Sequence, residues 1–181
     1  MPLNNIFRLC IMWSVLFGAA LAAEPDAKPL NTCKNSHPAE FKVLEQWRGT
    51  WDVRAINRRI PDKPVTYSES IDWILDGCYL RSETSRKSDG GQTMAMFWFD
   101  RFTKTYRYVF FDASGWALEL PPAEWNEPTR TMAWKSSLLN PTSYAATVTF
   151  KDGDTMHWKS LWKNWHGAVI LELEGTSTRR K

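Results

Sequence analysis

The feature that most constrains this chain is the alternation of its apolar residues. Aromatic and aliphatic side chains recur at every second position through several short segments. Because successive side chains of a strand point to opposite faces, this period indicates β-strands with one buried face. The clearest series are Val65, Tyr67, Ile71, Trp73 and Leu75; Tyr144, Ala146, Val148 and Phe150; and Met156, Trp158 and Trp162.

Turn residues separate these segments at short intervals. Asp76-Gly77, the run 88–91 and Asp152-Gly153 are typical of tight hairpins between antiparallel strands. The pattern predicts an all-β fold, a single antiparallel up-and-down barrel of about eight to ten strands. Its inner face would be either a filled core or a ligand chamber. The prolines at 121, 122 and 128 predict a loop at the barrel mouth.

A short helix is expected just before the strands. Ser36 is a candidate cap, Pro38 suits the first turn, and Phe41 and Leu44 share a helical stripe. Gly49 ends the helix, which we expect to cap one end of the barrel. The barrel domain is predicted to span residues 38–181.

The N-terminus has the features of a cleaved secretory signal peptide over residues 1–22. An almost unbroken apolar stretch runs from Leu9 to Leu21, and Ala20-Leu21-Ala22 provides a small-x-small cleavage site. A flexible, proline-containing arm over residues 23–37 is expected to follow. The protein is therefore predicted to be secreted or periplasmic.

Charge and hydropathy exclude some partners. The formal net charge is only +3, which is too balanced for nucleic acid to be the main partner. The apolar stretch of the signal is shorter than the roughly 20 residues that a bilayer requires, and no later segment is longer. Stable insertion into a membrane is therefore not expected.

Two cysteines remain after cleavage, Cys33 and Cys78. An even number of cysteines in an exported protein predicts a disulfide. This bond would close a loop of about 46 residues and contribute roughly 4 kcal/mol in the chain-entropy model. Two free thiols are the alternative.

Several short motifs resemble those of a known class of barrels. The lead into Gly49-Thr50-Trp51 resembles the entry of lipocalin-like, or calycin, barrels, which implies that the Trp closes the floor. More closely, the motifs resemble a family of secreted bacterial proteins of unknown function assigned to that fold class. The resemblance implies the fold and brings no catalytic residues. The motifs are Phe41-x-x-Leu44-x-x-x-x-Gly49-x-Trp51, Asp76-Gly77-Cys78-Tyr79-Leu80, Phe99-Asp100 with Thr103-Lys104-x-Tyr106, and Phe111-Asp112-x-x-Gly115-Trp116.

Parity places one acidic residue inside the barrel. Glu69 shares the parity of its apolar neighbours, and a buried carboxylate must be paired, hydrogen-bonded or protonated. It would orient a ligand or act as an acid or base. A β-bulge that turns Glu69 outward, or a structural pair with Arg81, are the alternatives. The residues predicted to line a ligand chamber are Tyr67, Glu69, Trp73, Trp98, Tyr108, Phe110 and Trp158.

Other chemistry has weaker support. No nucleophile elbow, phosphate-binding loop or zinc-protease helix is present, and no cofactor is expected. His157, His166 and Glu172 would be the donors of a metal site, and His166 the axial ligand of a haem. Trp116, Trp125 and Trp165 lie near turns and are candidates for a binding rim.

Three functions remain open. The first is a secreted module that encloses a small apolar or aromatic ligand. The second is an enzyme on the same barrel, with Glu69 or a histidine in proton transfer. The third is a filled structural barrel. The barrel alone cannot choose among them, because one fold supports many functions.

Overall fold

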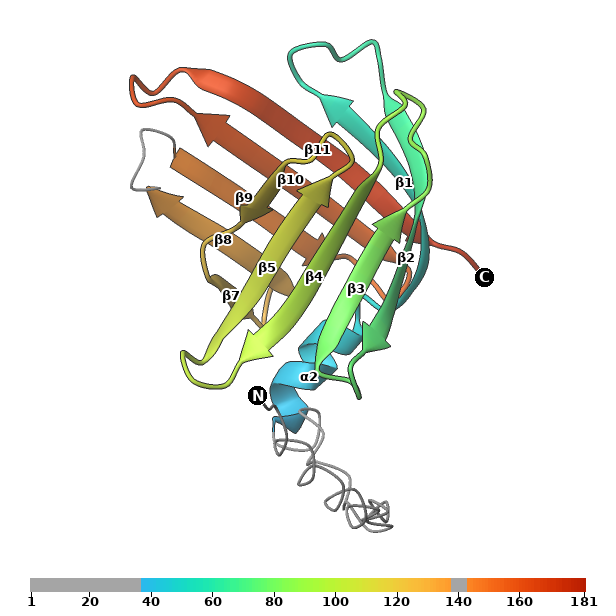
Figure 1. The fold of residues 1–181 in the computed structure, drawn as a ribbon, viewed down its shortest axis with the longest axis vertical. Coiled ribbons are helices and arrows are strands. Elements are labelled where there is room, and N and C mark those ends of the chain that lie inside the picture. The colour runs from blue at the N-terminus through green and yellow to red at the C-terminus, as the bar shows by residue number, and fades with distance from the viewer. Residues whose placement is uncertain (1–36, 138–142) are drawn as a thin grey trace, which may run out of the picture. The chain divides into compact units, whose positions relative to one another are not determined.

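The computed structural model describes residues 37–137 and 143–181, which form a closed antiparallel β-barrel with one short helix (Figure 1). The signal peptide predicted over 1–22, almost all of the arm over 23–37, and Cys33 lie outside these ranges. The Cys33–Cys78 disulfide therefore stays a prediction. No helix in the described part of the chain is long and apolar enough to cross a bilayer.

The sequence prediction of a single all-β barrel is confirmed. Ten of the strands in the described ranges form the closed ring β1-β2-β3-β4-β5-β7-β8-β9-β10-β11, and the short β6 pairs with β5 alone. The pairing of β4 with β5 closes the ring. The strands are β1 (Gly49–Asn57), β2 (Val65–Ile74), β3 (Tyr79–Thr84), β4 (Thr93–Asp100), β5 (Thr105–Asp112), β6 (Ala117–Glu119), β7 (Ala123–Asn126), β8 (Thr131–Ser137), β9 (Ser143–Phe150), β10 (Thr155–Lys163) and β11 (Val169–Arg179).

The helix α2 (Pro38–Glu45) lies at one end of the barrel, as predicted (Figure 1). It buries Phe41, Val43 and Leu44. Its N-cap is His37, whose side chain makes no capping hydrogen bond. The chain leaves the helix through Trp47, which is 3% exposed and meets Phe150 edge-on at 4.6 Å between ring centroids. The helix and Trp47 therefore fill one end of the barrel.

Two local predictions were wrong. Leu75 was assigned to the inward row of β2, but it begins a turn of left-handed residues (φ 49°) and is 67% exposed. The proline-rich segment after residue 120 was predicted to be a loop at the mouth. It contains β7, and Trp125 packs against Trp47 at the helix end. The prolines at 122 and 128 flank this four-residue strand instead of interrupting it, so proline content alone was misleading.

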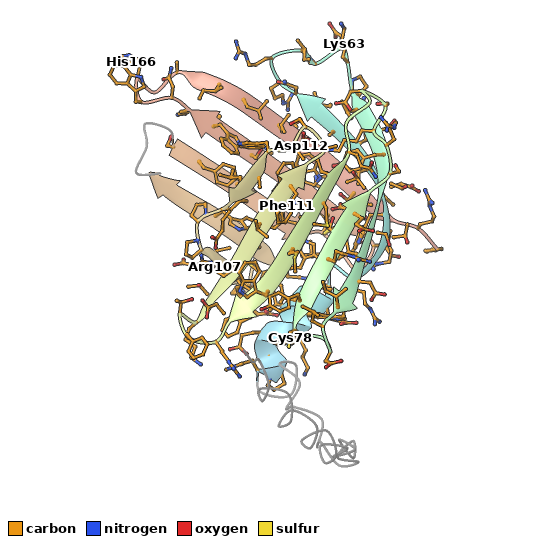
Figure 2. The ribbon with its side chains drawn as sticks, in the orientation of Figure 1. Lys63, Cys78, Arg107, Phe111, Asp112 and His166 are labelled. Atoms are coloured by element: carbon orange, nitrogen blue, oxygen red, sulfur yellow. The ribbon has the colours of Figure 1, made fainter. Side chains whose placement is uncertain are left out.

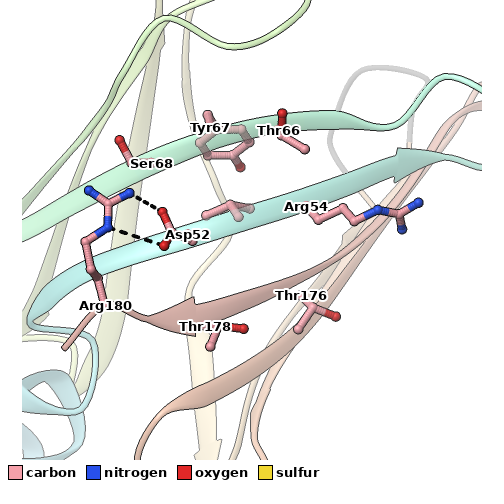
Figure 3. A pocket seen from close by; sticks show the side chains of 9 residues that line it. Asp52, Arg54, Thr66, Tyr67, Ser68, Thr176, Thr178 and Arg180 are labelled. Carbon is pink, nitrogen blue, oxygen red and sulfur yellow. Dashed lines mark hydrogen bonds and ion pairs between the residues drawn. The ribbon is translucent and has the colours of Figure 1, made fainter.

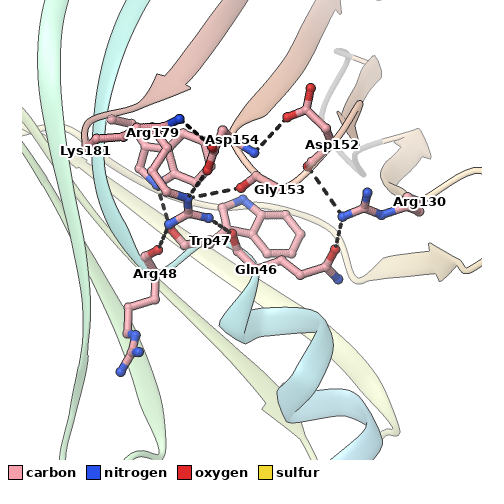
Figure 4. Close-up of polar contacts among 10 residues, drawn as sticks. Gln46, Trp47, Arg48, Arg130, Asp152, Gly153, Asp154, Arg179 and Lys181 are labelled. Carbon is pink, nitrogen blue, oxygen red and sulfur yellow. Dashed lines mark hydrogen bonds and ion pairs between the residues drawn. The ribbon is translucent and has the colours of Figure 1, made fainter.

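Arg179 joins the end of the last strand to the helix and the first strand (Figure 4). Its guanidinium lies 4.1 Å from the centroid of the fully buried Trp51 ring. The same group donates to the carbonyl oxygens of Gln46 (2.9 Å), Arg48 and Gly153 (3.1 Å). Two of these carbonyls follow the helix, and the third lies in the β9–β10 turn. One cation therefore satisfies three backbone acceptors and covers an indole face.

Gly49 makes the approach of Arg179 possible. Its φ is +129°, which L side chains rarely adopt, and an added Cβ would lie 2.5 Å from Arg179 Nη1. Trp51 is fixed from its other side, because its Nε1 donates to the Trp47 carbonyl at 2.7 Å. The Gly-x-Trp motif therefore stabilises the closed end of the barrel.

Arg179→Ala is expected to lower the free energy of unfolding by about 2 kcal/mol, because it leaves several carbonyls without a donor and uncovers Trp51. The neighbouring Arg180→Ala is the control, since Arg180 forms only an exposed ion pair with Asp52. Urea denaturation measures both. Equal effects of the two substitutions would contradict this role for Arg179.

Candidate ligand chamber

The barrel encloses a cavity of about 500 Å³, which we call the chamber. Its wall combines aromatic, aliphatic and a few polar side chains from strands all around the ring. The helix lies at one end of the barrel, near Cys78, and we call the opposite end, near Lys63 and His166, the mouth (Figure 2). A volume of this size suits a small organic ligand.

The chamber is hollow because the inward rows contain small residues. Ala146 and Ser177 line the chamber, and Gly175 has no side chain. An added Cβ on Gly175 would lie 2.3 Å from the Trp158 ring, so the indole occupies the space that glycine leaves. Large residues at the helix end fill the barrel, whereas small residues further along leave space.

Some of the residues that the sequence predicted to line a ligand chamber do lie on its wall. Tyr67, Glu69, Tyr108, Phe110 and Trp158 line the chamber. Several other wall residues were not among those predicted to line the chamber, although alternation had placed three of them, Tyr144, Ala146 and Trp162, on a buried face. These include Lys87, Trp116, Leu118, Trp134, Tyr144, Ala146 and Trp162.

Trp73 and Trp98 lie elsewhere, so their assignment to the chamber wall was wrong. Trp73 points to the helix end, where it stacks on Phe41 (5.3 Å between ring centroids) and donates from Nε1 to Glu45 at 2.5 Å. Trp98 is on the outer face beside Tyr79. Ala95 and Phe97 form the buried row of β4, so the even-numbered Trp98 faces away from it.

Glu69 lies on the chamber wall. The register of β2 with β1 and β3 is unbroken, so no bulge turns Glu69 outward. Arg81 is exposed and pairs with Glu83 on the outer surface. The Ser82 hydroxyl donates to Glu69 Oε1. No cation of the described chain lies within ion-pair distance of the Glu69 carboxyl.

Burial raises the pKa of the Glu69 carboxyl, and the Ser82 hydrogen bond and the charge of Lys87 only partly oppose this rise. Burial likewise raises the pKa of the Tyr67, Tyr108 and Tyr144 phenols, so all three stay protonated. The ammonium of Lys87 lies 5.0 Å from the centroid of the Tyr67 ring. Burial lowers the pKa of Lys87, against the attraction of nearby carboxylates.

The other candidate residues do not form the sites considered for them. Trp116 lines the chamber and contacts Phe110 and Trp162, but Trp165 is 68% exposed at a hairpin tip. No group of three metal-ligating side chains occurs in residues 37–137 and 143–181. His157 and His166 are exposed, and no histidine lines the chamber. A haem in the chamber would therefore have no histidine ligand.

A second hollow lies on the outer face of β1, β2 and β11 (Figure 3). It is an open groove of about 590 Å³ whose side chains are mostly hydroxyls and charges, including the Asp52–Arg180 ion pair. Such a groove removes little apolar surface from water. The chamber is therefore the better candidate for a ligand site.

The fold and the chamber define a β-barrel with an internal apolar cavity. A family model described as "Protein of unknown function (DUF1579)" matches residues 37–179. The chain therefore belongs to the DUF1579 family, which confirms the prediction of a barrel family of unknown function. Comparison with curated proteins found no match.

Solved structures with similar folds include Rv2717c of M. tuberculosis, with a TM-score of 0.56 and 12% identity over 79% of this chain and 98% of that one. An S-type phycobiliprotein lyase, CPES of Guillardia theta, has a TM-score of 0.48 and 16% identity over 77% and 92%. A redesigned β-barrel bound to DFHBI, mFAP1, has a TM-score of 0.42 and 13% identity over 76% and 98%. The similarity to Rv2717c supports the barrel fold.

Gly175→Ala is expected to displace the Trp158 ring and lower the free energy of unfolding by about 1–3 kcal/mol, the usual cost of overpacking. Gly153→Ala is the control, because an added Cβ there meets nothing within 4 Å. Thermal unfolding and near-UV circular dichroism test both. An unchanged indole spectrum in Gly175→Ala would contradict the proposed packing of Trp158.

Proposed function

We propose that this protein binds a small apolar or aromatic molecule inside the barrel. The observation that supports this function is the chamber of about 500 Å³ with a largely aromatic and aliphatic wall. Most of the interior polar groups are hydroxyls, which orient a ligand without requiring an ion pair. A filled barrel would need larger side chains at positions such as Ala146 and Ser177.

Burial of the ligand supplies the driving force. Apolar surface removed from water contributes roughly 25 cal/mol per Å² before the cost of association. Trp158, Trp162 and Trp134 present rings to the chamber, and such rings pack edge-on or offset against an aromatic ligand. The strength of binding would thus depend on the apolar body of the ligand.

Glu69 would fix the orientation of the ligand. A carboxyl with a raised pKa retains its proton to higher pH and can donate one hydrogen bond to a ligand carbonyl. Ser82 holds the other oxygen and keeps the group in place.

We further propose that the protein acts outside the cytoplasm. The signal-peptide features of residues 1–22 and the even number of cysteines in the rest of the chain, Cys33 and Cys78, support a secreted or periplasmic, lipocalin-like protein. An exported barrel of this kind would carry or store its ligand in the periplasm or the medium.

Binding of the neutral dye N-phenyl-1-naphthylamine tests the chamber. We expect saturable 1:1 binding with enhanced dye fluorescence. Ala146→Trp should reduce this affinity at least about tenfold by filling the cavity, which corresponds to about 1.4 kcal/mol. Ala145→Trp is the matched control, because Ala145 is exposed on the outer face of the same strand. If both variants bind the dye like the wild type, the ligand does not enter the chamber.

Glu69 should make stability depend on pH. Its folded pKa lies above its unfolded value, so the folded state binds more protons between the two. Stability therefore falls as pH rises through this window and stays lower above it. Glu69→Gln should remove this fall, whereas Glu83→Gln, on the outer surface, should retain it. Denaturation from pH 4 to 8 measures the dependence. A wild-type profile unchanged by Glu69→Gln would refute the assignment.

A further inference from the structure

Three phenol hydroxyls in the chamber have no protein partner. Tyr67, Tyr108 and Tyr144 line the chamber, and none of their hydroxyls makes a hydrogen bond to a described residue. Among the described residues, the one fully buried side-chain nitrogen or oxygen without a partner is Trp134 Nε1. The phenol oxygens are therefore reachable from the cavity. Unpaired polar groups in such a place indicate a polar partner on the ligand.

These groups lie on different parts of the wall. Tyr67 and Glu69 are on β2, Tyr108 is on β5 and Tyr144 is on β9. In the ring of ten strands, β2 and β9 are four steps apart in one direction and six in the other. Tyr144 and the Tyr67–Glu69 pair therefore come from opposite parts of the ring, and Tyr108 comes from a strand between them.

The charges of the chamber favour an uncharged ligand. Its cations are Lys87, which follows β3, and Lys159, which is exposed. A ligand carboxylate deep in the chamber would meet Glu69 with no cation at ion-pair distance. The protonated phenols can each donate a hydrogen bond, which a ligand with acceptors satisfies. An uncharged ligand with oxygen acceptors satisfies these groups without burying a second charge.

We infer that the ligand is a flat, uncharged molecule with hydrogen-bond acceptors at two opposite ends, and that a para-quinone is the chemical class that fits. One carbonyl faces Tyr67 and Glu69, and the other faces Tyr144. The ring system packs against the tryptophans between them. This inference rests on the proposed function, because it names the ligand class of the same chamber.

A series of two-ring compounds tests the inference. 2,3-Dimethyl-1,4-naphthoquinone has two carbonyls and blocked addition sites, 1-tetralone has one carbonyl, and tetralin has none. Calorimetric titration should rank their affinities in that order, with about fivefold between neighbours for each neutral hydrogen bond. Equal affinities would overturn the inference and leave the proposed function in place. Binding of none of the three, and of no neutral dye, would overturn both.

Tyrosine variants locate the two ends. Tyr144→Phe should reduce quinone affinity about fivefold and leave tetralin affinity unchanged. Tyr79→Phe is the matched control, because Tyr79 lies outside the chamber against Trp98. Tyr67→Phe tests the opposite end, and circular dichroism confirms that each variant is folded. If folded Tyr144→Phe and Tyr67→Phe bind the quinone like Tyr79→Phe, the two-ended recognition is wrong.

Discussion

The contact between Arg179 and Trp51 fixes the closed end of the barrel. Trp51 lies near the start of the first strand and Arg179 ends the last, so their stacking joins two strands that pair with each other in the ring. The guanidinium also reaches the carbonyls after the helix, which hold Trp47 in the barrel. A floor built in this way needs no contribution from the opposite end. The opposite end is therefore free to remain open.

The distribution of side-chain size explains why the same barrel is both stable and hollow. Trp47, Phe97 and Phe150 pack in edge-on or tilted pairs at the helix end and supply much of the buried apolar surface. Further along, Ala146 and Ser177 take inward positions and leave space that their neighbours do not fill. Trp158 lies over Gly175 and shapes this space. The helix end of the barrel thus provides stability, and the rest of the barrel provides the space for a ligand.

The alternation of apolar residues at every second position was sufficient to predict the fold, because each strand has one buried face and hairpin turns fix the pairing. It also placed Glu69 and Tyr108 on the inner face. It failed for Trp98, since a strand rich in aromatics on both faces has no clear parity. It failed differently for Trp73, which has inward parity but belongs to the filled end. Depth along the barrel axis depends on strand stagger, which alternation alone does not encode.

The positions of the polar groups in the chamber could be determined only from the structure. Ser82 and Glu69 come from neighbouring strands, and only the register of β2 with β3 brings them together. Lys87 follows a strand and is held by the turn at residues 87–91, so its place on the wall depends on loop geometry. No local pattern distinguishes such a lysine from a solvated one.

The central claim is that the chamber holds a small molecule, and native mass spectrometry of the protein purified from its own host tests this most directly. We expect a population with the additional mass of one small organic molecule, which denaturation releases in a one-to-one ratio. Its mass and absorption spectrum would identify the chemical class. A native spectrum with only the mass of the polypeptide, from a folded sample that also fails to bind neutral aromatic probes, would contradict the claim.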